Sequence, residues 1–497
     1  MTSAYPHLER RFAHIRALDQ AHGLLHWDRE TIMPPGGAAA RGEQLAALER
    51  VIHEKMTDSA LGDLLDEAEG GANLDLWRAA NLQRMRRAWR HANALEAELV
   101  EAQSRAISAG VGAWMEARSA SDFTAFLPAF EEVVRLSCDV AVAKGEAFGK
   151  SPYDALLESY EDEVTAEEID TLFGRLAAVL PNLRDRILEA QAVRPEPQLP
   201  EGPFPAERQQ ALGERLMTLA GFDTTCGRLD VSAHPFTGGA TGDVRITTRF
   251  DEYDFTSSVM AVMHETGHAL YEQGLPADWA FQPVGQAVNM TVHESQSLLI
   301  EMQASRSPEF HGHAAAIMRE ELGGSGDAWD AENLYRLAIR VAPGYIRVDA
   351  DEVHYPLHIM LRTRLERALI AGDLACADVP GAWNDGMAEL VGIVPENDAQ
   401  GCLQDIHWSA GLFGYFPTYS LGALAAAQLF RAANEQVPGI RPSLARGDFT
   451  PLLGWLREKI HSQGSLMSTH ALLREATGEG LSTAAFEAHL QQRYLEA

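Results

Sequence analysis

Residues 255–276 read FTSSVMAVMHETGHALYEQGLP and contain the motif HETGH. Residues four apart on a helix lie on the same face, so His264 and His268 can direct both imidazoles at one point. Glu265 follows the first histidine and lies to one side, where it can reach a water molecule rather than the metal. This HExxH arrangement predicts a zinc site in which Glu265 is the general base.

The residues around the motif support a helix. Thr256 or Ser257 can cap its start, and Gly274 followed by Pro276 can end it. A glycine inside a helix costs about 1 kcal/mol relative to alanine, so Gly267 needs a reason, and we expect its missing side chain to leave room beside the metal. Two histidines and a glutamate on an otherwise apolar helix are costly unless they bind something.

A catalytic zinc has three protein ligands and one open position. The candidates for the third ligand are Glu272, His293, Glu294 and Glu301. Residues 291–308 read as a second helix with Glu294 in its first turn. His293 points about 100° away from Glu294 on that helix, so both cannot bind one metal. Spacing favours Glu294 and leaves the others open.

Outward from this motif, most of the chain has helical patterns, as in residues 80–108, 123–147 and 166–192. Residues 192–205 contain five prolines, which no helix can accommodate. Residues 228–250 alternate and carry turn glycines, which predicts a small β-hairpin or meander.

These patterns predict a mainly α fold with a small β-sheet next to the HExxH helix. We expect one peptidase unit over residues 1–497. It comprises a helical N-terminal lobe (1–191), a proline-rich link (192–205) and a catalytic lobe with the zinc site (206–497).

Composition excludes several classes of protein. The chain is 46% hydrophobic and 23% charged, as expected for a globular protein. Its 71 acidic and 41 basic residues give a net charge of −30, which disfavours nucleic-acid binding. The four cysteines are scattered, no apolar run is long enough for a bilayer, and the N-terminus lacks a signal-peptide pattern. We therefore expect no membrane partner and a cytoplasmic location.

An ordered set of motifs resembles the carboxypeptidase Taq family of zinc metallocarboxypeptidases. These motifs are WD at residues 27–28, MPPGG at 33–37, HPF at 234–236, DVRIT at 243–247, HETGH at 264–268, HESQ at 293–296, IRVDAD at 346–351 and GCLQDIHW at 401–408. The resemblance implies that Glu294 is the third zinc ligand, with one zinc ion per chain. Because Co²⁺ and Mn²⁺ accept the same ligand set, the sequence does not distinguish them from zinc. The resemblance also implies a two-lobed helical body with a deep groove, and a cytoplasmic homodimer.

The implied activity is zinc-dependent hydrolysis of the C-terminal peptide bond with broad specificity, through a zinc-bound water activated by Glu265. The substrates would be peptides with a free C-terminus. An endo-oligopeptidase or a dipeptidyl carboxypeptidase on a similar scaffold is the alternative.

A carboxypeptidase must bind a carboxylate, and a guanidinium fork suits two oxygens. The resemblance favours Arg347, although the residues alone favour a structural pair with Asp349 or Asp351. Arg245 is the second choice, unless it braces the sheet through Asp243.

Three further side chains, His407, Tyr415 and Tyr419, are candidates for stabilising the oxyanion or binding substrate. We predict catalytic roles for His407 and Tyr415 and substrate binding for Tyr419. Each can equally be a core residue. Asp243 and Asp351 are predicted to orient a ligand imidazole.

Overall fold

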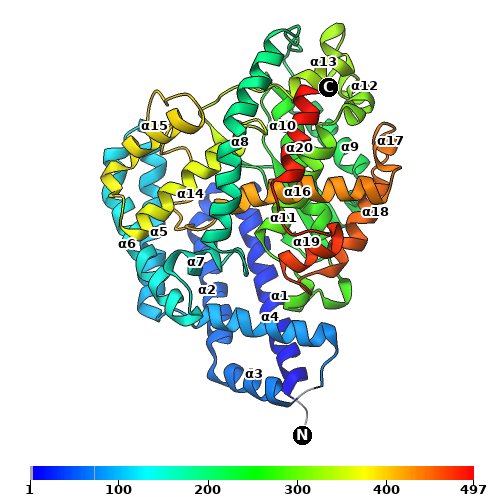
Figure 1. The fold of residues 1–497 in the computed structure, drawn as a ribbon. Helices are drawn as coiled ribbons and strands as arrows, with labels where there is room; N and C mark the ends of the chain where they lie inside the picture. Colours follow the sequence, from blue (N-terminus) through cyan, green and yellow to red (C-terminus); the bar gives the residue numbers. More distant parts are fainter. Residues whose placement is uncertain (1–3, 72, 497) are drawn as a thin grey trace. The chain divides into compact units, whose positions relative to one another are not determined.

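The structure, a computed structural model, describes residues 4–71 and 73–496 (Figure 1). The chain divides into two compact units. The first unit combines Met1–Ala92, Glu196–Ile339 and Ala425–Leu481. The second combines Asn93–Pro195, Arg340–Leu424 and Ser482–Ala497. Each unit is therefore assembled from three separate stretches of chain.

This division differs from the predicted lobes at 1–191 and 206–497. Residues 1–92 group with the stretch that contains the HExxH motif, and the rest of the predicted N-terminal lobe groups with residues 340–424. The proline-rich link does interrupt the helices, because one helix ends at Ala192 and the next begins at Ala206. Prolines reveal where a helix stops, but not with which distant segment it packs.

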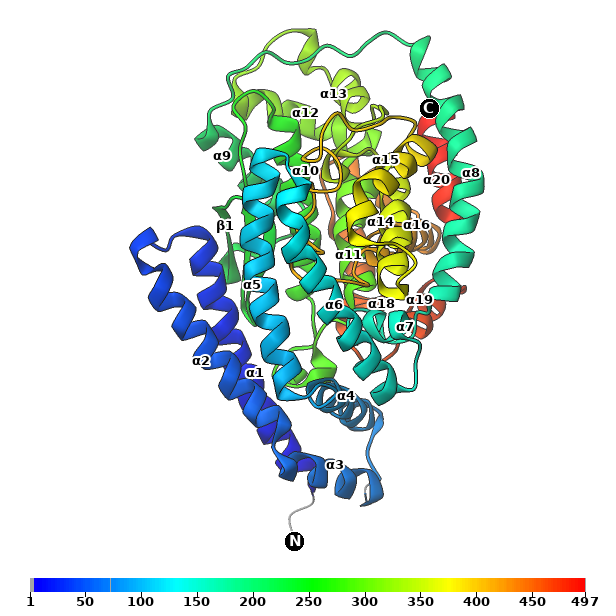
Figure 2. The ribbon, with the colours of Figure 1, turned by 90° about the vertical axis from the view of Figure 1, so that its left-hand side faces the viewer.

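The first unit contains most of the helices. They are α1 (Ala4–Thr31), α2 (Ala38–Thr57), α3 (Ser59–Gly71), α4 (Leu76–Ala92), α9 (Ala206–Leu219), α10 (Phe255–Glu272), α11 (Met290–Leu298), α12 (Pro308–Leu322), α13 (Ala331–Ala338), α17 (Ile440–Leu444), α18 (Thr450–Lys459) and α19 (Thr469–Thr477). Helices α1 and α2 lie side by side (Figure 2). Buried side chains of α1, α3 and α4, including Leu8, Leu61 and Met85, form one hydrophobic cluster.

The sheet of the first unit has three strands, β1 (Gly227–Val231), β2 (Phe236–Ala240) and β3 (Asp243–Thr248). Strands β2 and β3 form the predicted hairpin, paired antiparallel with Gly239 opposite Val244. The sheet is not a simple meander, because β1 pairs in parallel with β3, on the edge of β3 opposite β2. Both β2 and β3 contact α10, so the sheet lies next to the HExxH helix as predicted.

The second unit contains α5 (Ala97–Ala120), α6 (Phe123–Phe148), α7 (Pro152–Leu157), α8 (Ala166–Ala192), α14 (Tyr355–Ala371), α15 (Val379–Leu390) and α20 (Ala484–Leu495), and α16 (Pro417–Gln436) runs across the boundary at residue 424. Helices α5 and α6 pack side by side (Figure 2). The helix predicted over residues 80–108 is two helices, since α4 ends at Ala92 and α5 begins at Ala97.

The prediction of a mainly α fold with one small sheet is confirmed. Within residues 4–71 and 73–496, no helix combines the length and the apolar character needed to cross a membrane.

Candidate metal centre

Helix α10 presents the HExxH motif from a firmly packed position. Its residues Val259, Val262 and Leu270 are buried. The residue that caps the helix is Asp254, whose carboxylate accepts hydrogen bonds from the backbone amides of Thr256 and Ser257. The predicted caps are therefore wrong by two to three residues, because an aspartate accepts bonds from amides two and three positions ahead.

We predicted that the missing side chain of Gly267 leaves room beside the metal, and this prediction is wrong. A Cβ at this position would lie 2.4 Å from the carbonyl oxygen of Gln296 and 2.5 Å from Cα of Ser297. The missing side chain therefore lets α10 approach the backbone of α11. Asn289 caps α11 by accepting from the backbone amide of Val292. The close approach of the two helices brings the first turn of α11 to the histidines.

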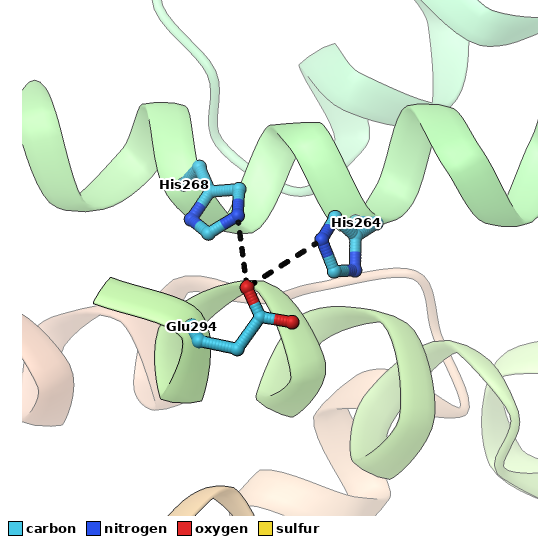
Figure 3. Close-up of side chains that lie close together, drawn as sticks. All are labelled: His264, His268 and Glu294. Atoms are coloured by element: carbon cyan, nitrogen blue, oxygen red, sulfur yellow. Dashed lines mark ion pairs between the residues drawn. The ribbon is translucent and has the colours of Figure 1, made fainter. Parts of the chain in front are cut away.

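Three predicted ligands come together at this point, and Figure 3 shows them facing one another from α10 and α11. Nε2 of His268 lies 3.5 Å from Oε2 of Glu294, and Nε2 of His264 lies 4.0 Å from the same oxygen. One ligand atom of each residue lies within 4.8 Å of the others. Glu294 is 4% exposed, so its charge is nearly removed from water.

These residues fit a divalent metal. Ligands of a tetrahedral zinc at bond lengths of 2.0–2.1 Å are about 3.3–3.4 Å apart, close to the separations found. The second carboxylate oxygen of Glu294, Oε1, is buried and has no hydrogen-bond partner among the described residues. A buried carboxylate oxygen without a donor is costly unless a cation faces it. Two imidazoles and one carboxylate are the donor set of catalytic zinc sites that keep a fourth position open.

The charges of the site follow from its geometry. Burial lowers the pKa of His264, but the carboxylates of Glu294 and Glu301 outweigh it and raise the pKa to about 10. For His268, burial dominates and the pKa is lowered. Burial raises the pKa of Glu294, but the two histidines reverse this and keep it below the ordinary value. Without a metal, the site thus holds a proton on His264 and a charge on Glu294.

Glu301, one of the alternative ligands, lies behind His264. Its Oε2 is 3.0 Å from Nδ1 of His264, the nitrogen that faces away from Glu294. Arg306 donates to the other oxygen of Glu301 at 2.6 Å. Glu301 belongs to a π-helical segment (Leu299–Ser305) that follows α11, so the predicted second helix is not a regular α-helix. Such segments are frequent at functional sites.

The predictions that Asp243 and Asp351 orient ligand imidazoles are wrong. Asp243 is paired with Arg245, and Asp351 accepts from Nδ1 of His354 in the second unit. Glu301 contacts Nδ1 of His264 instead. Closeness in sequence could not identify it as this partner, because it lies 37 residues from His264.

The other two alternative ligands, His293 and Glu272, form a chain behind His268. Nδ1 of His293 lies 2.6 Å from Nδ1 of His268, and its Nε2 lies 2.9 Å from Oε1 of Glu272. His293 therefore contacts His268, a predicted ligand, on the side of the ring away from Glu294.

Glu265 is held by the sheet. Its side chain is 6% exposed, and Oγ1 of Thr237 in β2 lies 2.7 Å from Oε2 of Glu265. The contact between Thr237 and Glu265 was not predicted from the sequence. The one feature that could have suggested Thr237 is its position directly after the HPF motif. The strand thus holds one carboxylate oxygen and fixes the orientation of the predicted base.

Arg245 pairs with Asp243, two residues away on the same strand, β3. Its Nε and Nη2 bond the two oxygens of Asp243 at 2.8 and 2.5 Å. Its guanidinium also lies 4.4 Å from the ring centroid of Trp27, which is 1% exposed.

Arg347 lies in the second unit and is 5% exposed. Its Nε and Nη2 donate to Oδ1 of Asp405 at 3.1 and 2.8 Å, so its partner is neither Asp349 nor Asp351. Arg362 donates to Oδ2 of the same carboxylate at 2.6 Å. Burial opposes charge on Asp405, but the two guanidiniums hold its pKa far below the ordinary value. Nη1 of Arg347 has no hydrogen bond to the described residues.

His407, Tyr415 and Tyr419 form a cluster in the second unit, and Tyr419 joins this cluster to Arg347. Nε2 of His407 lies 3.0 Å from the hydroxyl of Tyr419, and the Tyr419 ring lies 4.7 Å from the guanidinium of Arg347. The rings of Tyr415 and His407 are 5.6 Å apart. Burial, reinforced by the nearby guanidiniums, lowers the pKa of His407 to about 3, so the imidazole is neutral at pH 7.

Comparisons with known proteins point to one family of metallopeptidases. The family model of carboxypeptidase Taq (M32) metallopeptidases matches residues 7–494. Thermostable carboxypeptidase 1 of Thermus thermophilus is 39% identical over 506 residues, covering 99% of this chain and 98% of the relative. Carboxypeptidase 1 of Bacillus subtilis is 33% identical, covering 98% and 96%. The solved structure of metallocarboxypeptidase 1 of Trypanosoma cruzi superposes with a TM-score of 0.97, is 40% identical, and both chains are covered completely.

The fold and the site define a metallopeptidase. The chain belongs to the carboxypeptidase Taq (M32) family and is a metallocarboxypeptidase that hydrolyses peptide bonds. As a member of a metallopeptidase family, it uses a divalent metal.

Proposed function

We propose that the protein is a zinc enzyme that removes single amino acids from the C-terminus of peptides with broad specificity. The observation that carries this proposal is the gathering of His264, His268 and Glu294 beside Glu265, with the buried Oε1 of Glu294 left without a donor. Cobalt and manganese accept the same ligands, so they are expected to replace zinc in the isolated enzyme.

A divalent metal held by His264, His268 and Glu294 would supply Lewis-acid chemistry and make a water nucleophile available near neutral pH. Glu265 then accepts the proton of the attacking water and delivers it to the leaving amine nitrogen. Thr237 holds Oε2 of Glu265, which leaves Oε1 to exchange the proton. The low exposure of Glu265 and Glu294 keeps bulk water away from this transfer.

We propose that Arg347 binds the terminal carboxylate of the substrate. Asp405 holds its guanidinium through Nε and Nη2, which fixes the direction of the remaining nitrogen, Nη1. A guanidinium that is fixed before binding loses little side-chain entropy when it captures an anion. Arg245, whose Nε and Nη2 pair with Asp243, is the second choice.

We assign His407 and Tyr415 as hydrogen-bond donors to the developing oxyanion and Tyr419 to substrate binding. Support comes from their common cluster with Arg347 and from the neutral state of His407, which can donate one N–H without adding charge.

The test uses a peptide with a blocked N-terminus, a C-terminally amidated copy and the Glu265→Gln variant, with products followed by mass spectrometry. Stepwise loss of single C-terminal residues, absent with the amidated peptide and with the variant, is expected. Release of dipeptides or internal fragments, undisturbed by amidation, would instead show a dipeptidyl carboxypeptidase or an endo-oligopeptidase.

The role of Arg347 has its own test. Arg347→Lys keeps the charge and loses the fork, and kcat/KM for peptides with a free C-terminus is expected to fall about 100-fold. Arg245→Lys is the matched control and is expected to change kcat/KM much less. Equal losses in the two variants would contradict the assignment.

We further propose that the enzyme is a homodimer of the cytoplasm, as the resemblance to the family implies. Light scattering during gel filtration tests the first point and cell fractionation tests the second. A monomeric mass or recovery in another compartment would contradict them.

A further inference from the structure

The contact between His268 and His293 fixes the positions of two protons. The two Nδ1 atoms are 2.6 Å apart, a distance that requires one of them to donate and the other to accept. Nε2 of His268 faces Glu294 and must carry a lone pair to bind a metal. The proton of the neutral His268 ring therefore sits on Nδ1, and Nδ1 of His293 accepts it.

Glu272 adds a second hydrogen bond beyond His293. A neutral His293 that accepts at Nδ1 carries its own proton on Nε2. That nitrogen lies 2.9 Å from Oε1 of Glu272, so it donates to a carboxylate. The order His268, His293, Glu272 is thus a chain of two hydrogen bonds in which each donor has one acceptor.

The two metal-binding histidines are therefore supported differently. His264 donates directly to the carboxylate of Glu301, which Arg306 holds. On the side of its ring away from Glu294, His268 is connected to the carboxylate of Glu272 through the ring of His293. Because α11 approaches α10 at Gly267, α11 supplies both the ligand Glu294 and the ring of His293 behind His268.

We propose that His293 is a positioning residue that holds His268 in its metal-binding tautomer and orientation, and that Glu272 ends the chain that orients His293. The role differs from ligation, since His293 acts through another residue. This inference rests on the proposed metal site of His264, His268 and Glu294. Residues in such a position typically contribute 10- to 100-fold to metal affinity.

Zinc affinity of the full chain, measured by competition with a chromophoric chelator, tests the proposal without reference to activity. His293→Phe keeps a ring of similar size and removes both bonds, and we expect zinc to bind about 10- to 100-fold more weakly. His293→Asn places an amide oxygen near the former Nδ1 and keeps an acceptor for His268, so we expect affinity within a few-fold of the unaltered protein. Zinc binding by His293→Phe equal to that of the unaltered protein would overturn the proposal, and so would equal losses in the two variants.

Further measurements separate this outcome from misfolding and from failure of the metal site itself. Thermal unfolding of the metal-free variants should match that of the unaltered metal-free protein. If His293→Phe does not fold, Glu272→Ala carries the test. The Glu272 side chain is 31% exposed, so this variant should fold, and its zinc affinity is expected to fall several-fold. Unchanged zinc affinity in Glu272→Ala would overturn the proposed role of Glu272.

Glu294→Gln is the reference for the site on which the proposal rests. If it binds zinc as tightly as the unaltered protein, the proposed metal centre is wrong. If it loses zinc while His293→Phe retains it, only the role of His293 is wrong.

Discussion

Gly267→Ala probes the contact on which the metal centre depends. The added Cβ would lie 2.4 Å from the carbonyl oxygen of Gln296, where ordinary contacts begin at 3.4 Å, so the backbone of α11 must move by about 1 Å. Over-packing of this kind typically costs about 1–3 kcal/mol. The gain in helix propensity offsets about 1 kcal/mol of it. We expect the free energy of unfolding to fall by up to about 2 kcal/mol.

The same displacement acts on the ligands. Glu294 lies two residues before Gln296 on α11, and metal sites tolerate deviations of only about 0.5 Å. Zinc affinity should therefore fall at least about tenfold in the variant.

Gly312→Ala is the matched control in the same unit. Gly312 lies exposed inside α12, and a Cβ there meets no atom within 4 Å. This change should raise the free energy of unfolding by about 1 kcal/mol and leave zinc binding intact. Urea unfolding and chelator competition on both variants measure the difference. If Gly267→Ala stabilises the protein as Gly312→Ala does and binds zinc normally, the argument from the close approach of the two helices is refuted.

Three further predictions follow from contacts in the two units. Thr237→Val removes the hydroxyl that holds Glu265, so kcat should fall about tenfold with metal content unchanged, whereas Thr237→Ser should retain most of it; equal rates in the two variants would contradict this. Zinc affinity should rise about tenfold per pH unit between about pH 6 and 9, because His264, with a pKa of about 10 in the metal-free site, must release one proton to bind. Competition experiments across this range measure it, and a slope of zero would show that His264 is neutral before binding. Asp405→Ala leaves two buried guanidiniums without their carboxylate, so the free energy of unfolding should fall by about 3–5 kcal/mol. Glu389→Ala removes an exposed ion pair, so urea unfolding should show a loss of less than about 1 kcal/mol in the free energy of unfolding. Similar losses in Asp405→Ala and Glu389→Ala would contradict the larger effect expected from burial.

Local patterns determined a large part of this protein. Helical spacing put His264 and His268 on one face of α10, because four residues make about one helical turn. Alternation identified β3, and the prolines of residues 192–205 marked the gap between α8 and α9. These features depend on the period and stereochemistry of a few neighbouring residues, which is why they can be recognised without a fold.

Contacts between distant residues were outside the reach of such patterns. Spacing nominated Glu272, His293, Glu294 and Glu301 and favoured Glu294, but it could not show that Glu301 and His293 lie behind His264 and His268. That arrangement depends on how closely α11 approaches α10.

The pairing of Arg347 with Asp405, 58 residues away, was equally hidden, because two nearer aspartates were available. The division into two units, each made of three stretches, was decided by packing as well. The sequence by itself determined the elements and the metal-binding motif, since these follow from local backbone geometry. Only the tertiary structure decided which side chain serves which partner, because burial and distance between remote residues are set by the packing of whole helices.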